Sequence, residues 1–320
     1  MGLKIGVQMD GLNTIIPYHD TTFALMLAAQ ARGHEVWHFT PNNVAYNQGT
    51  VTAWASKLYK MDAEGHIENN DPILVDLRDF DIILMRQDPP FDMAYITNTH
   101  LLEMVTDSTL VLNDPAEVRN APEKLWVLDY EEFMPPTMVA KDIRDIKAFY
   151  KEYKDIIIKP LHSMGGAGVF RLKPDDANLE SLLEIYAERN NEPLMAQAFV
   201  PQVSAGDKRI IIIDGEPCGV LNRVPDLGAV RANMASGGRA EPGKMTDRYY
   251  EICNALKAEL RERGLLLVGI DVIGDYLTEI NVTSPTGLQE IERFDNVDLR
   301  STFWDAAETM LDNFYTEEDD

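Results

Sequence analysis

Two neighbouring stretches settle the architecture of this 320-residue chain: Val268-Gly-Ile-Asp-Val-Ile-Gly-Asp275 and Leu277-Thr-Glu-Ile-Asn-Val-Thr-Ser-Pro285. Both are short, apolar and rich in β-branched residues, and the first ends in a Gly-Asp pair. They therefore predict an antiparallel hairpin, with strands at 265–273 and 277–282.

Three residues carry the charged or amide side chains of the two strands: Asp271, Glu279 and Asn281. Loop length decides whether they share a face, because side chains alternate along a strand. A two-residue turn at 274–275 would place an apolar residue opposite Glu279 and mix the faces. A three-residue loop at 274–276 pairs Asp271 with Glu279 and leaves the apolar residues on the other face, so amphipathic character favours the longer loop.

That polar face is a set of oxygen ligands. Two carboxylates and an amide, in a chain with two cysteines and no cluster of Cys or His, suit Mg²⁺, or Mn²⁺ in its place, better than Zn²⁺. The alternative interpretation is a strand face that is merely solvated.

The charge of the whole chain excludes other classes of partner. It has 53 acidic and 29 basic residues, a net charge of −24. Such a protein repels nucleic acid and anionic membrane surfaces, so neither is an expected partner. The segment from Met1 to Val7 enters an apolar strand without a signal-peptide pattern, so we expect a cytoplasmic protein.

The few cations gather near the hairpin in sequence. Between Asp207 and Arg248 there are seven basic residues against six acidic ones. Lys159 ends an apolar strand, and the loop at 162–168 that follows contains three glycines, which let backbone amides approach a phosphate. A strand-end lysine, a glycine loop, an arginine-bearing segment and a carboxylate hairpin, in this order, fit the binding of a magnesium nucleotide.

The first third of the chain alternates strands with helices. We expect strands at 4–9, 35–40, 81–86 and 109–112, and helices at 20–31 and 94–106. This order is typical of a mostly parallel sheet covered on both faces, whose ligands bind at the carboxyl ends of the strands.

The order changes beyond a boundary predicted between Asn113 and Pro122. Short strands are expected at 137–140, 155–159, 168–172, 193–199, 208–213 and 218–223, with helices at 142–151, 179–189, 247–263 and 299–314. The stretch 224–244 is rich in glycine and alanine without periodicity, which predicts a long loop.

One familiar motif lacks the structure that it needs. His34-Glu-Val-Trp-His38 matches the zinc-protease pattern, which requires both imidazoles on one helix face. The segment follows a helix-stopping glycine and is predicted to be extended, which separates the two histidines by about 13 Å.

At the hairpin and the glycine loop the sequence resembles the ATP-grasp superfamily, and over nearly its whole length it closely resembles the bacterial glutathione synthetases. The matching segments are Met85–Asp92, Ile158–Leu161, Met164–Gly166, Met195–Gln197, Gly206–Arg209, Ala235–Arg239 and the two stretches quoted first. The resemblance implies an α/β and α+β protein. A Rossmann-like, pre-ATP-grasp domain at 1–121 would bind substrate, and an ATP-grasp domain of two subdomains with antiparallel sheets would follow at 122–320. The lid would lie at about 124–200 and a flexible loop at about 224–241.

The resemblance also implies roles for individual residues. ATP would be bound by Lys124, Lys159, Gly165, Gly166, Gln197, Phe199, Val200 and Asp207, and the metal by Asp271, Glu279 and Asn281. Arg209 and Arg223 would be catalytic, stabilising the transferring phosphoryl group. The substrate would be bound by Asp20, Arg86, Arg231, Ser236, Gly237 and Arg239.

The implied reaction is the ATP-dependent ligation of γ-glutamylcysteine to glycine through an acyl phosphate, by a homotetramer. Alternatives are an ATP-grasp ligase for another acid or amine and a nucleotide-binding protein without catalysis. The chain departs from the family pattern at two places. Pro17-Tyr-His19 stands where relatives tend to carry lysines, and His162-Ser163 replaces the usual Asp-Gly.

Overall fold

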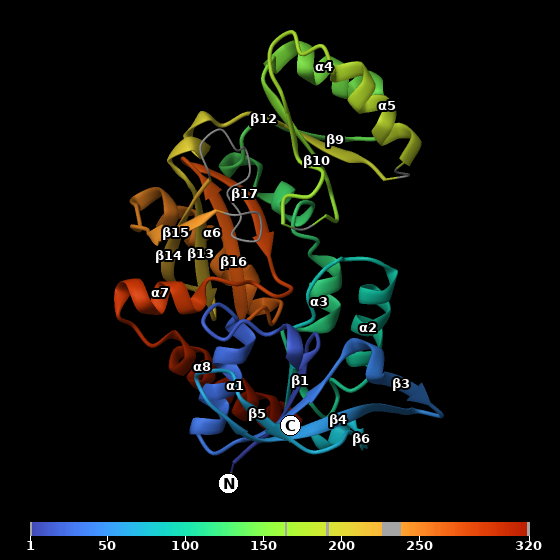
Figure 1. Ribbon diagram of the computed structural model, residues 1–320, viewed down its shortest axis with the longest axis vertical. Helices are drawn as coiled ribbons and strands as arrows, with labels where there is room; N and C mark the ends of the chain where they lie inside the picture. Colours follow the sequence, from blue (N-terminus) through green and yellow to red (C-terminus); the bar gives the residue numbers. More distant parts are fainter. Residues whose placement is uncertain (1, 164, 190–191, 226–237, 319–320) are drawn as a thin grey trace.

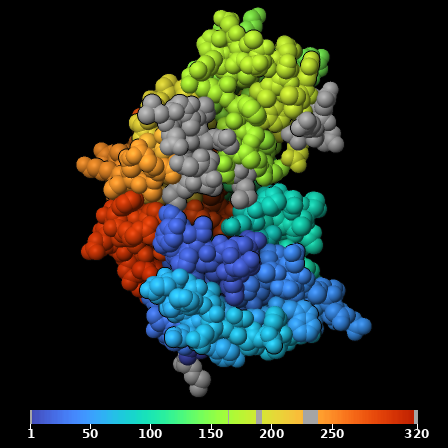
Figure 2. Space-filling model, in the orientation of Figure 1, coloured from blue at the N-terminus to red at the C-terminus, as the bar shows by residue number. Residues whose placement is uncertain are grey.

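The computed structural model describes residues 2–163, 165–189, 192–225 and 238–318. Three sheets divide this chain, and the lid formed by the second sheet and its helices lies at one end of the molecule (Figure 1). In the space-filling view the lid is a separate lobe above the N-terminal part (Figure 2). The mixed α/β architecture predicted from the sequence is confirmed.

The N-terminal sheet has a parallel centre, as predicted. Its strands β1 (Lys4–Gln8), β2 (Glu35–Phe39), β7 (Ile82–Met85) and β8 (Leu110–Leu112) pair in the order β2-β1-β7-β8. Helix α1 (Thr21–Ala31) is capped by the Asp20 carboxylate, which accepts a hydrogen bond from the backbone N–H of Phe23. Helices α2 (Met93–Glu103) and α3 (Pro115–Asn120) follow β7 and β8.

An antiparallel extension of this sheet was not predicted. Strands β3 (Val44–Asn47), β4 (Thr50–Met61), β5 (Ile67–Asn69) and β6 (Ile73–Asp76) add to it through β4, which pairs with β2. Val51, Ala53 and Ala55 face the core, whereas Trp54 is exposed. The sheet is therefore mixed rather than mostly parallel at this side.

The lid is a four-stranded antiparallel sheet under two helices. Strands β9 (Thr137–Ala140), β10 (Ile156–Pro160), β11 (Phe170–Leu172) and β12 (Leu194–Ala198) pair in the order β11-β10-β12-β9. Ile156 and Ile158 pack against residues of α4 (Ile143–Tyr153) and α5 (Leu179–Arg189). Because side chains alternate, Ile157 and Lys159 face the opposite side.

The third sheet contains the hairpin. Strands β13 (Asp207–Ile213), β14 (Glu216–Val224), β15 (Arg239–Pro242), β16 (Leu267–Ile273) and β17 (Tyr276–Asn281) pair antiparallel in the order β15-β14-β13-β16-β17. The expectation of a loop throughout 224–244 is wrong at β15, whose backbone pairs with β14. The two flanking segments that were predicted as strands, β13 and β14, are confirmed.

The register of the hairpin is as predicted, but its loop is not. Asp271 pairs with Glu279, while the turn is the two-residue one at Gly274-Asp275. A β-bulge at Thr278 inserts the extra residue that restores the parity, and the Thr278 hydroxyl donates to the Asp271 carbonyl at 3.1 Å. The alternation of polar and apolar residues therefore predicted the strand pairing correctly. It could not distinguish a bulge from a longer loop, because either one adds a single residue between the paired positions.

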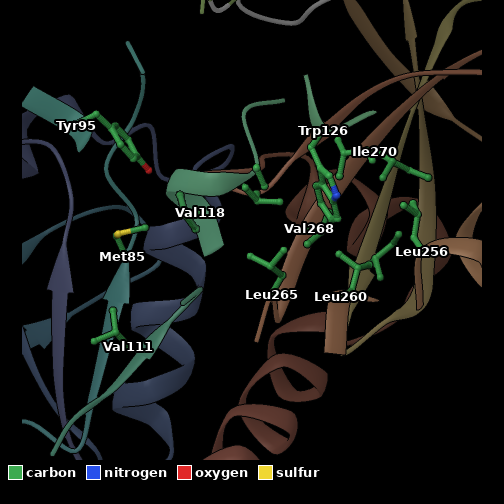
Figure 3. Packing of buried hydrophobic residues seen from close by; sticks show 14 of the residues in the cluster. Met85, Tyr95, Val111, Val118, Trp126, Leu256, Leu260, Leu265, Val268 and Ile270 are labelled. Carbon is green, nitrogen blue, oxygen red and sulfur yellow. The ribbon is translucent and has the colours of Figure 1, made fainter. Parts of the chain in front are cut away.

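Each face of the third sheet is covered differently. Helix α6 (Asp247–Glu262) covers one face, where a continuous apolar cluster reaches from Leu260 and Val268 through Trp126 to Met85 in the N-terminal sheet (Figure 3). The short helix η4 (Trp126–Phe133) lies in this cluster. The N-terminal part and the third sheet consequently share one core.

Helices α7 (Leu288–Asp295) and α8 (Leu299–Glu318) pack on the other face and against α1. Trp304 of α8 is fully buried, and its indole N–H donates to the Leu25 carbonyl at 2.9 Å. Within the described residues, no helix has both the length and the apolar character to cross a bilayer.

Candidate active site

A cavity of about 360 Å³ lies between the lid and the third sheet. This volume is within the range of small-molecule sites. Its walls come from the lid strands, from the charged end of β13–β17, from the residues before η4 and from the segment Thr283–Gly287.

The lid contributes a mostly apolar wall. Ile157, Val169 and Phe199 line the cavity there together with Gln197, whose amide donates to the Thr137 hydroxyl at 2.9 Å. An apolar slot with an amide at its edge suits a planar heterocycle, which buries its faces and forms hydrogen bonds at its edge.

The third sheet contributes a wall of buried ion pairs. The Arg209 guanidinium binds Asp271 with Nε–Oδ1 2.6 Å and Nη2–Oδ2 3.1 Å. Arg223 Nη2 lies 2.9 Å from Asp271 Oδ2 and 2.5 Å from Asp207 Oδ2. The strand register produces this arrangement, since Arg209 pairs with Asp271 and Asp207 with Arg223.

Two buried lysines meet at Glu279. Lys124 Nζ lies 3.6 Å and Lys159 Nζ 3.5 Å from Glu279 Oε1. Lys124 also forms an ion pair with Glu123 and donates to the Ser163 carbonyl at 2.9 Å. The glycine loop thus begins at a residue whose backbone is already bonded to one of the lysines.

Burial and pairing shift the pKa values of these groups in opposite directions. Burial raises the pKa of Asp207 to about 6, and burial together with the nearby Glu279 raises that of Glu123 to about 7. Burial also opposes ionisation of Asp271, but Arg209 and Arg223 outweigh it and hold its pKa below the ordinary range. Burial lowers the pKa of Lys159.

Carboxylates and cations lie side by side in the cavity lining. Five carboxylates (Asp88, Glu123, Asp207, Asp271, Glu279) line the cavity with four cations (Lys124, Lys159, Arg209, Arg223), and each cation is paired with one of the carboxylates. Divalent cations that accompany a polyanion would offset its negative charge in such a site. The arrangement therefore suits a nucleoside triphosphate together with its metal ions.

The donors on the hairpin fit a hard cation. Asp271 and Glu279 face each other across β16 and β17, and Asn281 follows on the same face with its amide N–H bonded to the Gly269 carbonyl at 3.1 Å. Because this bond uses the amide nitrogen of Asn281, the amide oxygen is the atom that could bind a cation. Carboxylate and amide oxygens are the ligands that Mg²⁺ and Mn²⁺ take, so the residues present fit such an ion.

The structure brings most of the predicted site residues together. The cavity is lined by Lys124, Lys159, Gly165, Gly166, Gln197, Phe199, Val200, Asp207, Arg209, Arg223, Asp271, Glu279 and Asn281. Arg239 is exposed and ion-paired with Glu241 at 3.6 Å, away from the cavity lining. Arg231, Ser236 and Gly237 lie outside the described residues.

Asp20 and Arg86 are not among the described residues that line the cavity. Asp20 caps α1. Arg86 is buried, and its guanidinium donates to the Thr22 hydroxyl and to the carbonyl of Pro285, each at 3.0 Å. Since Pro285 lines the cavity, Arg86 is connected to the cavity wall through this hydrogen bond.

Sequence reasoning did not single out several residues that line the cavity, among them Glu123, Asp88 and Ser284. Glu123 directly precedes Lys124, and an acidic residue next to a lysine is too common in sequences to indicate a site. Ser284 lay within a quoted motif, but its position beside Arg86 depends on the fold, because the Ser284 hydroxyl donates to the Arg86 carbonyl at 3.4 Å.

The two histidines of the protease-like pattern lie at opposite ends of β2 and do not converge. His34 Nε2 lies 3.0 Å from Glu308 Oε1, and His38 Nε2 lies 3.0 Å from the Asp10 carbonyl. Among the residues that the structure describes, no three His, Cys, Asp or Glu side chains gather as a metal site.

Comparison with protein families gives two matches. Residues 3–119 match the N-terminal domain of prokaryotic glutathione synthetase, and residues 123–296 match its ATP-grasp domain.

Curated relatives named glutathione synthetase are similar over nearly the full length. The Brucella melitensis protein is 53% identical over 309 residues, which cover 96% of this chain and 99% of that protein. The Vibrio vulnificus protein is 41% identical over 314 residues, 97% of this chain and 99% of its own.

Solved structures share the fold at low identity. A D-cycloserine synthetase has a TM-score of 0.68 at 18% identity, covering 96% of this chain and 99% of its own. A RimK-domain ATP-grasp protein from Sphaerobacter thermophilus has a TM-score of 0.60 at 17% identity, covering 94% and 98%. The three sheets and the cavity between the second and third thus belong to an ATP-grasp fold.

Proposed function

The chain belongs to the prokaryotic glutathione synthetase family and is an ATP-dependent ligase, and from this premise we infer that it joins γ-glutamylcysteine to glycine while converting ATP to ADP and phosphate. The observation that carries the inference at the site is the cavity in which four cations, each paired with a carboxylate, lie beside an apolar slot. That combination supports a nucleotide with its phosphates directed at the hairpin.

We propose that the nucleotide base occupies the slot lined by Gln197, Phe199 and Val200. Lys124 and Lys159 then exchange their contacts with Glu279 for the phosphates, and the glycine loop with Gly165 and Gly166 closes over them. The backbone φ values at these two glycines are 62° and 76°, a region that favours glycine. Because glycine has no side chain, the backbone of the loop can approach the phosphates closely there.

The metal ions are part of this proposal. Asp271, Glu279 and Asn281 would hold Mg²⁺, or Mn²⁺ in its place. A bound ion neutralises charge on the phosphoryl group during transfer. Arg209 and Arg223, held in place by Asp271 and Asp207, would stabilise the same charge from the protein side.

The reaction proceeds in two steps. The cysteinyl carboxylate attacks the γ-phosphate and forms an acyl phosphate with release of ADP. The glycine amine then attacks the acyl carbon, loses a proton and displaces phosphate. The protein contributes mainly by orienting the reactants and excluding water, since the chemistry requires no covalent bond to the enzyme.

We propose that the peptide substrate is bound by Asp20 and Arg86 of the N-terminal part and by Arg231, Ser236, Gly237 and Arg239 of the ATP-grasp part. The domain limits 1–121 and 122–320 remain part of the proposal, supported by the ranges that the two family models match.

We further propose that the enzyme is a cytoplasmic homo-oligomer, a tetramer by resemblance. An exposed cross-strand pair on the antiparallel extension, Trp54 with Leu74, supports a contact between copies, since both side chains are more than half exposed. Light scattering of Trp54→Glu tests this, and an unchanged mass would exclude that face from the contact.

The deciding experiment measures ADP release by the purified protein with Mg-ATP, γ-glutamylcysteine and glycine, omitting each in turn. Release that needs all three, with glutathione formed in equal amount, supports the proposal. Release with other acids or amines would favour a different ligase, and nucleotide binding without release would favour a non-catalytic protein.

A further inference from the structure

Three aromatic rings connect the glycine loop with the substrate side of the cavity. The His162 ring, directly before Ser163, stacks on Phe91 with centroids 6.0 Å apart and an interplanar angle of 24°. Phe91 in turn contacts Tyr95 at 5.1 Å. The column runs from the root of the glycine loop into α2 of the N-terminal part.

The inner end of the column lies next to the segment that carries the arginine proposed to face the peptide. Tyr95 is fully buried in α2, which follows that segment directly. Arg86 and Phe91 lie on the same loop, at 86–92, between β7 and α2. Displacement of Phe91 therefore disturbs the segment that carries Arg86.

The outer end of the column belongs to the nucleotide side. Leu161 is buried, which anchors the chain after β10, and the Ser163 carbonyl accepts a hydrogen bond from Lys124 at 2.9 Å. When Lys124 turns to a phosphate, it gives up that bond. More of the contact between the loop root and the N-terminal part then depends on the ring of His162.

His162 acts here through the face of its ring. Its Nδ1 atom is buried and has no hydrogen-bond partner among the described residues.

We propose that the Phe91–His162 stack is a positioning contact that couples the nucleotide and peptide sites, so that binding of either ligand strengthens binding of the other. The inference rests on the proposed function. Because coupling between binding sites is reciprocal, the nucleotide must change the affinity for the peptide by the factor by which the peptide changes the affinity for the nucleotide. An aromatic pair of this kind supports a coupling of about two- to tenfold.

The test measures the dissociation constant of γ-glutamylcysteine by calorimetry, with and without a saturating non-hydrolysable ATP analogue and Mg²⁺. Phe91→Ala and His162→Ala should each reduce the wild-type coupling factor toward one, and the double variant should reduce it no further. His162→Phe should keep it, because the ring face is retained. In steady state, the alanine variants should raise KM for γ-glutamylcysteine about two- to tenfold at saturating ATP, with kcat within twofold.

The matched control is Tyr153→Ala, which removes a ring pair with Phe149 in lid helix α4 at a centroid distance of 4.5 Å. It should leave the coupling factor unchanged. A wild-type factor of one, alanine variants that keep the wild-type factor, or a His162→Phe variant that loses it would each overturn the inference. Glutathione formation by the wild-type protein, measured in parallel, shows whether the proposed function itself holds.

Discussion

Glu279→Gln removes one negative charge from between two buried lysines while keeping the shape of the side chain. Glu279 Oε1 lies 3.5 Å from Lys159 Nζ and 3.6 Å from Lys124 Nζ, and the side chain is 20% exposed. At these separations, with an effective dielectric constant near 20, each attraction is roughly 4 to 5 kcal/mol before desolvation is subtracted.

The net effect is smaller than the sum of these attractions, because the buried carboxylate also loses its hydration. Removing one partner of a buried ion pair costs about 3 to 5 kcal/mol, and the glutamine oxygen still accepts a hydrogen bond, so we expect a loss of about 3 kcal/mol in the free energy of unfolding. For a chain of 320 residues that corresponds to a Tm lower by about 4 to 5 °C.

Binding of a nucleotide should raise the stability of Glu279→Gln toward that of the wild type but should not restore its turnover. Phosphate oxygens supply negative charge to Lys124 and Lys159, so saturating ADP in the presence of a chelator should narrow the difference in Tm between variant and wild type. Turnover with Mg-ATP should fall about 100- to 1000-fold, as for loss of a group that stabilises developing charge. Scanning calorimetry and the coupled ADP assay measure the two effects.

Asp275→Asn is the control, since this exposed residue lies in the turn of the same hairpin. Its Tm and turnover should match those of the wild type. Turnover of Glu279→Gln within threefold of wild type would remove Glu279 from the site. An unchanged Tm without nucleotide would refute the charge argument.

Three further predictions concern stability. Glu259 accepts hydrogen bonds from Trp126 and Tyr130 and pairs with Arg263; burial opposes the shift, but these contacts lower its pKa below 4.5. The contribution of ionised Glu259 to stability is therefore complete above that pH and is lost as the pH falls through the lowered pKa. In urea unfolding, Glu259→Gln should lower the free energy of unfolding by about 1 kcal/mol at pH 7, after allowance for solvent screening. This difference from the wild type should shrink below about pH 4.5. Asn113→Ala should cost about 2 to 3 kcal/mol by the same measurement, because it removes three buried hydrogen bonds to the backbone of Leu267 and Val282; a cost below 1 kcal/mol would contradict this. Trp304→Ala should cost about 3 to 5 kcal/mol and Trp304→Phe far less, since most of the loss is packing and only one hydrogen bond goes to Leu25; equal costs would show that the hydrogen bond dominates.

The parts of the fold that could be predicted are those with strong local patterns. The helix that starts at Asp20 and the strand at Thr137–Ala140 have a capping residue and an apolar run, respectively, and both form where expected. The strands between Val44 and Asp76 could not be predicted in the same way. Strands β4 and β6 do contain β-branched and aromatic residues that favour strands, but residues 44–76 show no local signal for how these strands pair. The pairing of β4 with β2, which buries Ala53 and Ala55, is tertiary context.

The candidate site shows the same division. Its hairpin register followed from the alternation of polar and apolar residues, and the family motifs located the lysines and arginines. The partners of those cations could not be predicted. That Asp207 meets Arg223, or Glu123 meets Lys124 beside Glu279, depends on the register of β13 with β14 and on the docking of the lid. Short polar residues make such contacts without any signature in sequence spacing.

The packing of α8 on α1 has a consequence for biosynthesis. Phe23, Leu25 and Ala29 of α1 are fully buried, and part of their cover comes from residues 299–311 of α8. On the ribosome, α1 emerges long before α8, so a nascent chain exposes this apolar surface until nearly all of the sequence described here has been translated. Helix α1 is therefore synthesised early but completes its packing late. A chain shortened before Trp304 should expose apolar residues of α1 to chaperones, although α1 lies far in sequence from the point of truncation.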